Sequence, residues 1–238
     1  MKKLIVFLCC VAILCSIGVA AFADHDLSGM TDDELSELQK AVEAEIRSRK
    51  TTQNSDAGET FEAMVYSGSG DKVLALDPIP AAHVFRISGN AGSHYFGVIA
   101  YDAQGEKLGA IVNTTEVYNG IVFEKKQAAA TLEIKSSDAW EITVLPLADM
   151  ETAYKGGTIS GSGDSIILFS PDAGESMSAL VEGNKGENYF GVIGYSDTLD
   201  KIGAFVNTTD AYNGQVMLKK NPRVFEIKSE GDWSITFE

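Results

Sequence analysis

The sequence predicts an all-β protein in which two tandem antiparallel β-sandwich repeats, jelly-roll or immunoglobulin-like, follow one short α-helix. Two observations lead to this prediction. Short motifs recur in the same order at a spacing of 93 or 94 residues, and within each copy apolar and polar residues alternate with a period of two. We therefore assign a signal peptide, an amphipathic helix, a linker, a first repeat, a second linker and a second repeat to residues 1–23, 24–50, 51–60, 61–147, 148–157 and 158–238.

Residues 1–23 have the three parts of a secretory signal. Lys2 and Lys3 precede an apolar run from Leu4 to Val19, and Ala21-Phe22-Ala23 offers small residues for cleavage. The run is shorter than the roughly 20 residues that cross a bilayer as a helix. We therefore predict that the chain is cleaved after Ala23 and secreted, and that the extracellular product is soluble and not attached to a membrane.

The composition argues against several classes of function. The formal net charge is −15, and an acidic surface repels nucleic acid and anionic lipid. Cys9, Cys10 and Cys15 all lie within the predicted signal, so the secreted chain has no thiol for disulfides, catalysis or metal binding. We predict no cofactor and no metal. Calcium binding by Asp71 and Asp164 is left open, as an alternative to a role of the acidic residues in solubility alone.

A helix start follows the predicted cleavage site. Thr31 is a typical N-cap and Glu34 completes a capping box, so we expect a helix over residues 32–49. Its apolar stripe is too small to stabilise a lone helix in water. The helix must therefore pack on a sandwich, bind a partner or mediate self-association. The stripe consists of Leu35, Leu38, Val42 and Ile46.

The two repeats are defined by motifs that recur in the same order. The matched pairs are Ser67–Asp71 with Ser160–Asp164, Tyr95–Ile99 with Tyr189–Ile193, Val112–Thr115 with Val206–Thr209, Tyr118–Gly120 with Tyr212–Gly214, Glu133–Ser136 with Glu226–Ser229, and Trp140 with Trp233. So many ordered matches at a nearly constant offset indicate an internal duplication that fills most of the secreted chain.

The patterns within each copy predict short antiparallel strands. Apolar residues alternate with polar ones after Trp140, and Tyr95–Tyr101 is apolar on both faces, as in a central strand. We expect the tryptophans to anchor the cores and Gly70-Asp71 to form a turn before a strand. The pairs Asn119-Gly120 and Asn213-Gly214 are typical of hairpin turns in which the asparagine has a positive φ angle.

No catalytic machinery is evident in the sequence. The histidines are His25, His83 and His94, and none has a histidine counterpart in the other repeat, so a catalytic triad or zinc site on the duplicated scaffold is not expected. Glu133 and its counterpart Glu226 fall on strand faces that we expect to be exposed. We therefore predict that the protein is not an enzyme. A hydrolase with a carboxylate pair between the repeats is the alternative.

Two segments resemble parts of known proteins. Leu27–Arg49, which contains Met30-Thr31-Asp32-Asp33-Glu34-Leu35, resembles the N-terminal helix of secreted proteins of Gram-positive bacteria. The repeats, from Gly68-Ser69-Gly70-Asp71 through Trp140-Glu141-Ile142, resemble β-sandwich repeats of exported bacterial proteins that have no assigned activity. The resemblance implies export and a tandem β-sandwich fold, and it brings no catalytic or ligand-binding motif.

These observations favour a secreted, non-enzymatic binding or adhesion module, with an extracellular glycan or protein as its partner. Tyrosine and amide side chains suit sugars and polar peptides. We therefore predict one ligand-binding site in each copy, formed by Asn113, Tyr118 and Asn119 in the first repeat and by Asn207, Tyr212 and Asn213 in the second. A structural protein that assembles outside the cell through its helix is the alternative.

Overall fold

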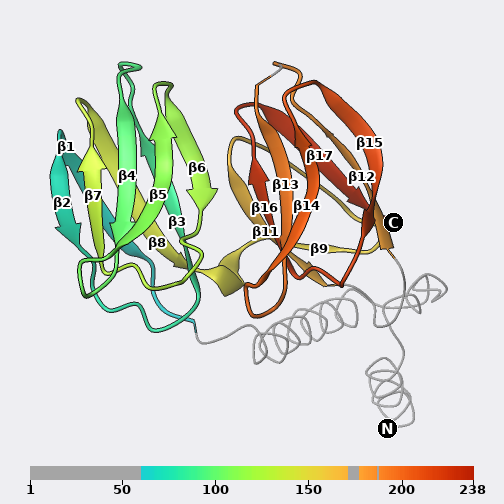
Figure 1. Ribbon diagram of the computed structural model, residues 1–238, viewed down its shortest axis with the longest axis horizontal. Helices are drawn as coiled ribbons and strands as arrows, with labels where there is room; N and C mark the ends of the chain where they lie inside the picture. The colour runs from blue at the N-terminus through green and yellow to red at the C-terminus, as the bar shows by residue number, and fades with distance from the viewer. Residues whose placement is uncertain (1–59, 171–176, 187) are drawn as a thin grey trace, which may run out of the picture. The chain divides into compact units, whose positions relative to one another are not determined.

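The computed structural model describes residues 60–170, 177–186 and 188–238, which form an almost entirely β structure (Figure 1). The predicted signal peptide, the predicted helix and nearly all of the first linker lie outside this part of the chain. The described residues belong to one compact unit. Among them, no helix has the length and apolar character that crossing a membrane requires.

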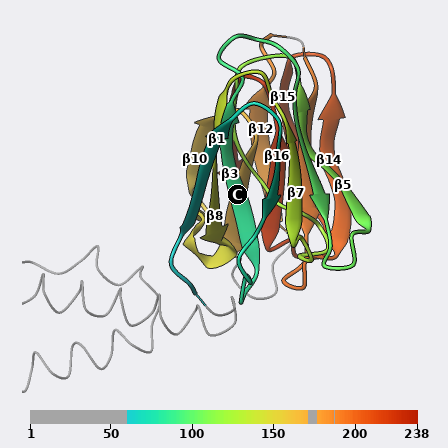
Figure 2. The same cartoon turned by 90° about the vertical axis from the view of Figure 1, so that its left-hand side faces the viewer.

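The first repeat is a sandwich of two antiparallel four-stranded sheets. The sheets have the orders β1-β8-β3-β6 and β2-β7-β4-β5. Figure 2 shows β1, β3 and β8 in one layer and β5 and β7 in the other. The strands are β1 (Met64–Ser69), β2 (Lys72–Ala75), β3 (His83–Gly89), β4 (Phe96–Tyr101), β5 (Lys107–Thr114), β6 (Tyr118–Val122), β7 (Thr131–Lys135) and β8 (Ala139–Pro146). An eight-stranded sandwich with this order is a jelly roll.

The second repeat has the same topology. Its sheets have the orders β10-β17-β12-β15 and β14-β13-β16-β11-β9. The strands of the jelly roll are β10 (Thr158–Ser162), β11 (Ser165–Ser170), β12 (Met177–Gly183), β13 (Phe190–Tyr195), β14 (Lys201–Thr208), β15 (Tyr212–Leu218), β16 (Val224–Lys228) and β17 (Asp232–Phe237). The prediction of antiparallel β-sandwiches is thus confirmed, and of the two predicted topologies the jelly roll is the one observed.

The segment between the two jelly rolls has structure of its own. A 3₁₀ turn, η2 (Leu147–Asp149), is followed by β9 (Thr152–Tyr154), which pairs in parallel with β11. Leu147 and Met150 are both buried. Within residues 148–157, which we assigned to a linker, β9 therefore extends one sheet of the second repeat.

Each sandwich encloses its own apolar core because inward-facing and outward-facing positions alternate. On β8, Trp140 and Ile142 are buried, whereas Ala139 and Glu141 are exposed. Burial of one large apolar side chain contributes about 1.5–3 kcal/mol. Large side chains that are fully buried include Phe85, Ile87, Phe96, Leu132, Ile134 and Ile142 in the first core and Phe190, Phe225, Ile227, Ile235 and Phe237 in the second.

A tryptophan and a glycine pack together at the corner where the chain crosses between the sheets. Trp140 is 4% exposed, and its Nε1 donates a hydrogen bond of 3.0 Å to the carbonyl oxygen of Gly70. A Cβ atom at Gly68 would lie 2.5 Å from the indole ring, so only glycine fits there. Gly70 has a φ of +73° and forms the predicted turn between β1 and β2.

Asp71 fastens the same corner to the end of β7. Its Oδ1 accepts a hydrogen bond of 3.0 Å from the backbone N–H of Ser136, and its Oδ2 lies 3.2 Å from Lys135 Nζ. The bond from Ser136, together with Lys135, lowers the pKa of Asp71. The second repeat reproduces this corner with Gly161, Gly163, Asp164, Ser229 and Trp233.

The Asn-Gly pairs do not form the predicted hairpin turns. Asn119-Gly120 lies within β6, Asn213-Gly214 lies within β15, and neither asparagine has a positive φ angle. The prediction was wrong because both pairs lie inside strands, and in the first repeat the glycine instead permits a close approach. A Cβ atom at Gly120 would lie 2.9 Å from the Cβ of Asp164 in the second repeat.

Glu226 is buried, at 3% exposure, although we expected it and Glu133 to be exposed. The Tyr195 hydroxyl donates a hydrogen bond of 2.6 Å to Glu226. Burial raises the pKa of Tyr195, and the bond to Glu226 raises it further. Glu133 is only half-buried. The difference arises because apolar residues of the first repeat cover this face of the second repeat, a contact that strand alternation alone does not encode.

The packing of Trp140 leads to a first prediction. Gly68→Ala should destabilise the first repeat by about 1–3 kcal/mol, because the added methyl group overpacks the indole ring. Chemical denaturation followed by tryptophan fluorescence would measure this loss. Gly231→Ala is the control, since a Cβ atom there meets nothing within 4 Å. Equal stability of the two variants would contradict this account of the corner.

A second prediction concerns His83, which is 2% exposed at the start of β3. Its Nδ1 lies 3.1 Å from the carbonyl oxygen of Ala81, and its Nε2 has no hydrogen-bond partner in the described part of the chain. Burial lowers the pKa of His83, while the hydrogen bond with Ala81 and the charge of Glu124 act in the opposite direction with smaller effects. The folded protein therefore keeps this imidazole neutral at a pH where the unfolded chain protonates it.

Stability should consequently fall as the pH drops below the unfolded histidine pKa of about 6.5, by at most about 1.4 kcal/mol per pH unit. Urea denaturation at about pH 7.5 and about pH 5.5 would measure the slope, and this window lies above the ordinary titration range of carboxylates. His83→Gln should remove most of the slope. The same slope in both proteins would show that another group is responsible.

Candidate ligand-binding site

A tyrosine ring lies across a glycine at the start of β4. Tyr95 is 51% exposed. A Cβ atom at Gly97 would lie 2.6 Å from the Tyr95 hydroxyl oxygen and 3.0 Å from the adjoining ring carbon. The phenol therefore rests on the space that the glycine leaves free, and about half of the side chain remains available to a ligand.

An asparagine amide lies beside this ring. Asn113 on β5 is the register partner of Gly97 on β4, and its side chain is exposed. Cross-strand partners have Cβ positions about 4.5–5.5 Å apart on one face of the sheet. The Tyr95 ring and the Asn113 amide thus occupy neighbouring positions on one sheet face. Asn113 belongs to the site predicted from the sequence, whereas Tyr95 does not.

The same arrangement is present in the second repeat. Tyr189 is 47% exposed, and a Cβ atom at Gly191 would lie 2.7 Å from its hydroxyl oxygen. Asn207, which we had also predicted, is the register partner of Gly191 and is exposed. We call these two groups, Tyr95/Gly97/Asn113 and Tyr189/Gly191/Asn207, the tyrosine–asparagine sites.

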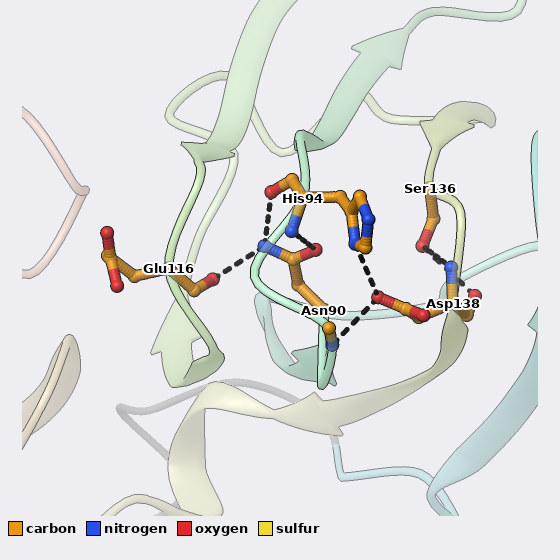
Figure 3. A network of polar contacts seen from close by, with 6 residues as sticks. Asn90, His94, Glu116, Ser136 and Asp138 are labelled. Atoms are coloured by element: carbon orange, nitrogen blue, oxygen red, sulfur yellow. Dashed lines mark hydrogen bonds and ion pairs between the residues drawn. The ribbon is translucent and has the colours of Figure 1, made fainter.

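A buried asparagine holds together the loops beside the first site (Figure 3). Asn90 has a φ of +67° and is fully buried. Its Nδ2 donates hydrogen bonds to the carbonyl oxygens of His94 at 2.5 Å and Glu116 at 2.8 Å, and its Oδ1 accepts one from the His94 N–H at 2.9 Å. The loop before Tyr95 is therefore tied to the loop after β5.

In the second repeat, an asparagine side chain makes the equivalent hydrogen bonds between two loops. Asn184 has a φ of +59°, and its Nδ2 donates hydrogen bonds to the carbonyl oxygens of Asn188 and Asp210. The signal was present in the sequence, because the motif Gly-Asn-x-Gly occurs at 89–92 and again at 183–186. It is not among the motif pairs that define the repeats above.

The first tyrosine–asparagine site opens onto a hollow of about 720 Å³ that is lined by both repeats. The Thr114 hydroxyl oxygen accepts a hydrogen bond of 3.0 Å from the Glu116 N–H, which shapes the loop on one side. Hydroxyl, amide and carboxylate groups dominate the lining. The residues are Tyr95, Asn113, Thr114, Thr115, Glu116, Asn188 and Glu230.

The other residues predicted for the first site lie in a different environment. The Tyr118 hydroxyl donates a hydrogen bond of 2.8 Å to Asp164 Oδ2 in the second repeat. Burial raises the pKa of Tyr118, and the Asp164 carboxylate raises it further. Asn119 is exposed on the edge strand β6. Tyr118 thus joins the repeats and does not meet Asn113 at the first tyrosine–asparagine site.

Tyr212 and Asn213 are the corresponding residues of the second repeat. The Tyr212 ring packs against the second core and lies 6.5 Å from the Phe190 ring, centroid to centroid. The Asn213 Nδ2 donates a hydrogen bond of 2.8 Å to Glu182. Of the three residues predicted in each repeat, only Asn113 and Asn207 belong to a tyrosine–asparagine site.

The described residues contain no group of three or more His, Cys, Asp and Glu side chains arranged to hold a metal ion. The two aspartates considered for calcium have structural partners. Asp71 is bonded to Ser136 and Lys135, and Asp164 is bonded to Ser229, Lys228 and Tyr118.

No protein family and no curated protein matches this sequence. Among solved structures, the chain is similar to the CUB1-EGF-CUB2 domain of human MASP-1/3, with 8% identity, a TM-score of 0.25, and coverage of 76% of this chain and 96% of that chain. It is also similar to the regulatory subunit of a cAMP-independent protein kinase A from Trypanosoma cruzi bound to guanosine, with 9% identity, a TM-score of 0.22, and coverage of 74% and 72%. TM-scores this low give no basis for transferring a function.

Proposed function

We propose that this protein is an exported, non-enzymatic binding module that holds a glycan at each of its two tyrosine–asparagine sites. Export rests on the signal-like residues 1–23. The observation that carries the proposal is the duplicated arrangement in which an exposed tyrosine ring lies over a glycine with an asparagine amide beside it.

The chemistry of these groups suits a sugar ring. One face of a pyranose is a patch of C–H groups, which packs on a flat aromatic face, while its hydroxyl groups need both donors and acceptors. A tyrosine ring supplies the first and an asparagine amide supplies the second. Glu116 and Glu230 add negative charge to the hollow, which disfavours uronic acids and phosphorylated glycans. We therefore propose neutral or amino sugars as ligands.

The duplication suits weak binding of a repetitive polymer. Two linked sites that engage one polymer raise the apparent affinity by effective concentration, without any new contact at either site. A change at one site should therefore weaken binding to an immobilised polysaccharide strongly, yet leave monovalent binding at the other site intact.

A third prediction tests the sites directly. The combined Tyr95→Ala and Tyr189→Ala variant should bind a neutral polysaccharide, identified first on a glycan array, at least tenfold more weakly, which corresponds to about 1.4 kcal/mol. Isothermal titration with a short oligosaccharide would measure the monovalent affinity. Tyr154→Ala is the matched control, because Tyr154 is also 51% exposed but lies on β9, outside both sites.

Gly97→Ala with Gly191→Ala provides a second test that keeps both tyrosines. The new methyl groups would displace the phenol ends, which are the flexible ends of their side chains, so the fold should survive while the rings leave their positions. Binding should fall as it does in the tyrosine variants. Unchanged binding in both double variants would rule out the tyrosine–asparagine sites.

A hydrolase is the second candidate, because Glu116 and Glu230 bring one carboxylate from each repeat to the same hollow. Acid catalysis of glycoside cleavage needs one carboxyl group that is shielded from water and so keeps its proton. Both side chains are exposed, which favours binding over cleavage. Turnover of a bound oligosaccharide that is abolished by Glu116→Gln or Glu230→Gln would establish the hydrolase instead.

A further inference from the structure

The two repeats meet through an apolar contact between the strand edge of one and the sheet face of the other. The ring of Phe123, just after β6, lies edge-on to the ring of Tyr195 on β13, with centroids 5.0 Å apart. Phe123 is 4% exposed and Tyr195 is 1% exposed. Around them lie Val84, Leu147, Met150, Ile166, Ile193 and Val224.

Polar bonds fix the register of this contact. The Ile121 N–H, on the edge strand β6, donates a hydrogen bond of 2.8 Å to the carbonyl oxygen of Asp164. The Tyr118 hydroxyl donates to the carboxylate of the same aspartate, and Gly120 provides the space that the aspartate needs. One repeat thus contributes an edge strand, and the other contributes the corner and outer face of a sheet.

Because the chain is duplicated, it carries each half of this contact a second time. The edge strand β15 of the second repeat presents Tyr212, Gly214 and Met217 where β6 and its end present Tyr118, Gly120 and Phe123. We call this the open edge.

The outer face of the first repeat presents Asp71, Val73, Ile99 and Tyr101 where the second repeat has Asp164, Ile166, Ile193 and Tyr195. We call this the open face.

The open edge and the open face are both exposed to solvent in the described part of the chain. Met217 is 56% exposed, whereas its counterpart Phe123 is buried. Val73 is 71% exposed, whereas its counterpart Ile166 is 2% exposed. The internal bonding of the face is retained, because the Tyr101 hydroxyl donates to Glu133 at 2.7 Å as Tyr195 does to Glu226. No hydrogen-bond partner of the Tyr212 hydroxyl is seen among the described residues.

We propose that the open edge of one molecule docks on the open face of a second copy of this chain, in the geometry that joins the two repeats within one molecule. The Tyr212 hydroxyl would then donate a hydrogen bond to the Asp71 carboxylate of the next molecule, as the Tyr118 hydroxyl does to Asp164 within one chain, and Met217 would cover Tyr101. The two patches differ from each other, so the contact is heterologous, and a docked pair of molecules keeps one free edge and one free face. Association is therefore head-to-tail, and further molecules can add at either free patch. An unpaired edge strand such as β15 is well suited to this role.

The contact between molecules is weaker than the contact within one. Beside the open edge, Gln215 on β15 and Ser178 on the adjacent β12 replace the apolar Ile121 and Val84 of the first repeat. Within a chain, the connecting segment also holds the repeats at a high effective concentration, which separate molecules lack. We therefore expect reversible association that depends on protein concentration.

This association leaves the tyrosine–asparagine sites accessible. In the second repeat, whose face is already covered by the first, Tyr189 remains 47% exposed and Asn207 remains exposed. By equivalence, a molecule docked on the open face leaves Tyr95 and Asn113 free. The proposed assembly does not depend on whether these sites bind a glycan.

A fourth prediction concerns single substitutions that disrupt one patch at a time. For the protein purified after export, sedimentation velocity should show a weight-average mass that rises with concentration. Val73→Lys on the open face and Met217→Asp on the open edge should each return the mass to that of a monomer at the same concentration, because docking needs both patches. Val65→Lys and Val117→Asp are matched controls, since both residues are 62% exposed and neither belongs to the open edge or the open face.

Mixing the two disrupted variants separates a head-to-tail contact from a symmetric one. Val73→Lys retains an intact edge and Met217→Asp retains an intact face, so an equimolar mixture should form a species of about twice the monomer mass and no larger one. The proposal is overturned if the wild-type protein is monomeric at every concentration. It is also overturned if either disrupted variant associates as the wild-type protein does, or if the mixture stays monomeric.

Discussion

The fold depends on the contact between an indole ring and a glycine at the corner where the chain passes from one sheet to the other. Trp140 lies on the sheet that contains β1, and Asp71 ties the start of β2 to the end of β7 in the opposite sheet. Trp140 Nε1 donates a hydrogen bond to the carbonyl oxygen of Gly70, in the turn between β1 and β2. This turn is therefore bonded to both sheets of the sandwich. Larger residues at Gly68 would separate the indole ring from this turn, which explains why the two glycines, the aspartate and the tryptophan all recur in the second copy.

The same corner joins the two repeats. In the second copy, Asp164 accepts a hydrogen bond from Ser229 within its own sandwich and another from Tyr118 of the first repeat. Lys228 lies 3.1 Å from this carboxylate and balances its charge in a partly buried setting. A residue needed for the turn is therefore reused at the interface. Duplication of the sandwich has thus supplied a binding surface along with a second core.

The sequence allowed the duplication, the strands, the glycine turn and the role of Trp140 to be predicted, because each depends on local pattern. It did not allow the function of Asn119-Gly120 to be predicted, since a glycine that forms a turn and a glycine that permits close packing look alike in one dimension. Tyr95 was visible as a repeated residue. Its position beside Asn113 follows only from the register of β4 against β5, which no local pattern encodes. The burial of Glu226 likewise depends on the neighbouring repeat.

The two ends of the repeat pair resemble capped ends only in part. Terminal repeats of stacked arrays usually carry polar outer faces, because nothing covers them. That pattern is present at Gln215 on β15 and at Ser178 on the neighbouring β12, whose side chains both bond to Glu238. Val73 and Met217 do not fit the pattern of a capped end, because both are apolar side chains that are more than half exposed. Polar substitutions around a retained apolar centre reduce the strength of a contact without abolishing it, as expected of an interface that forms and dissociates.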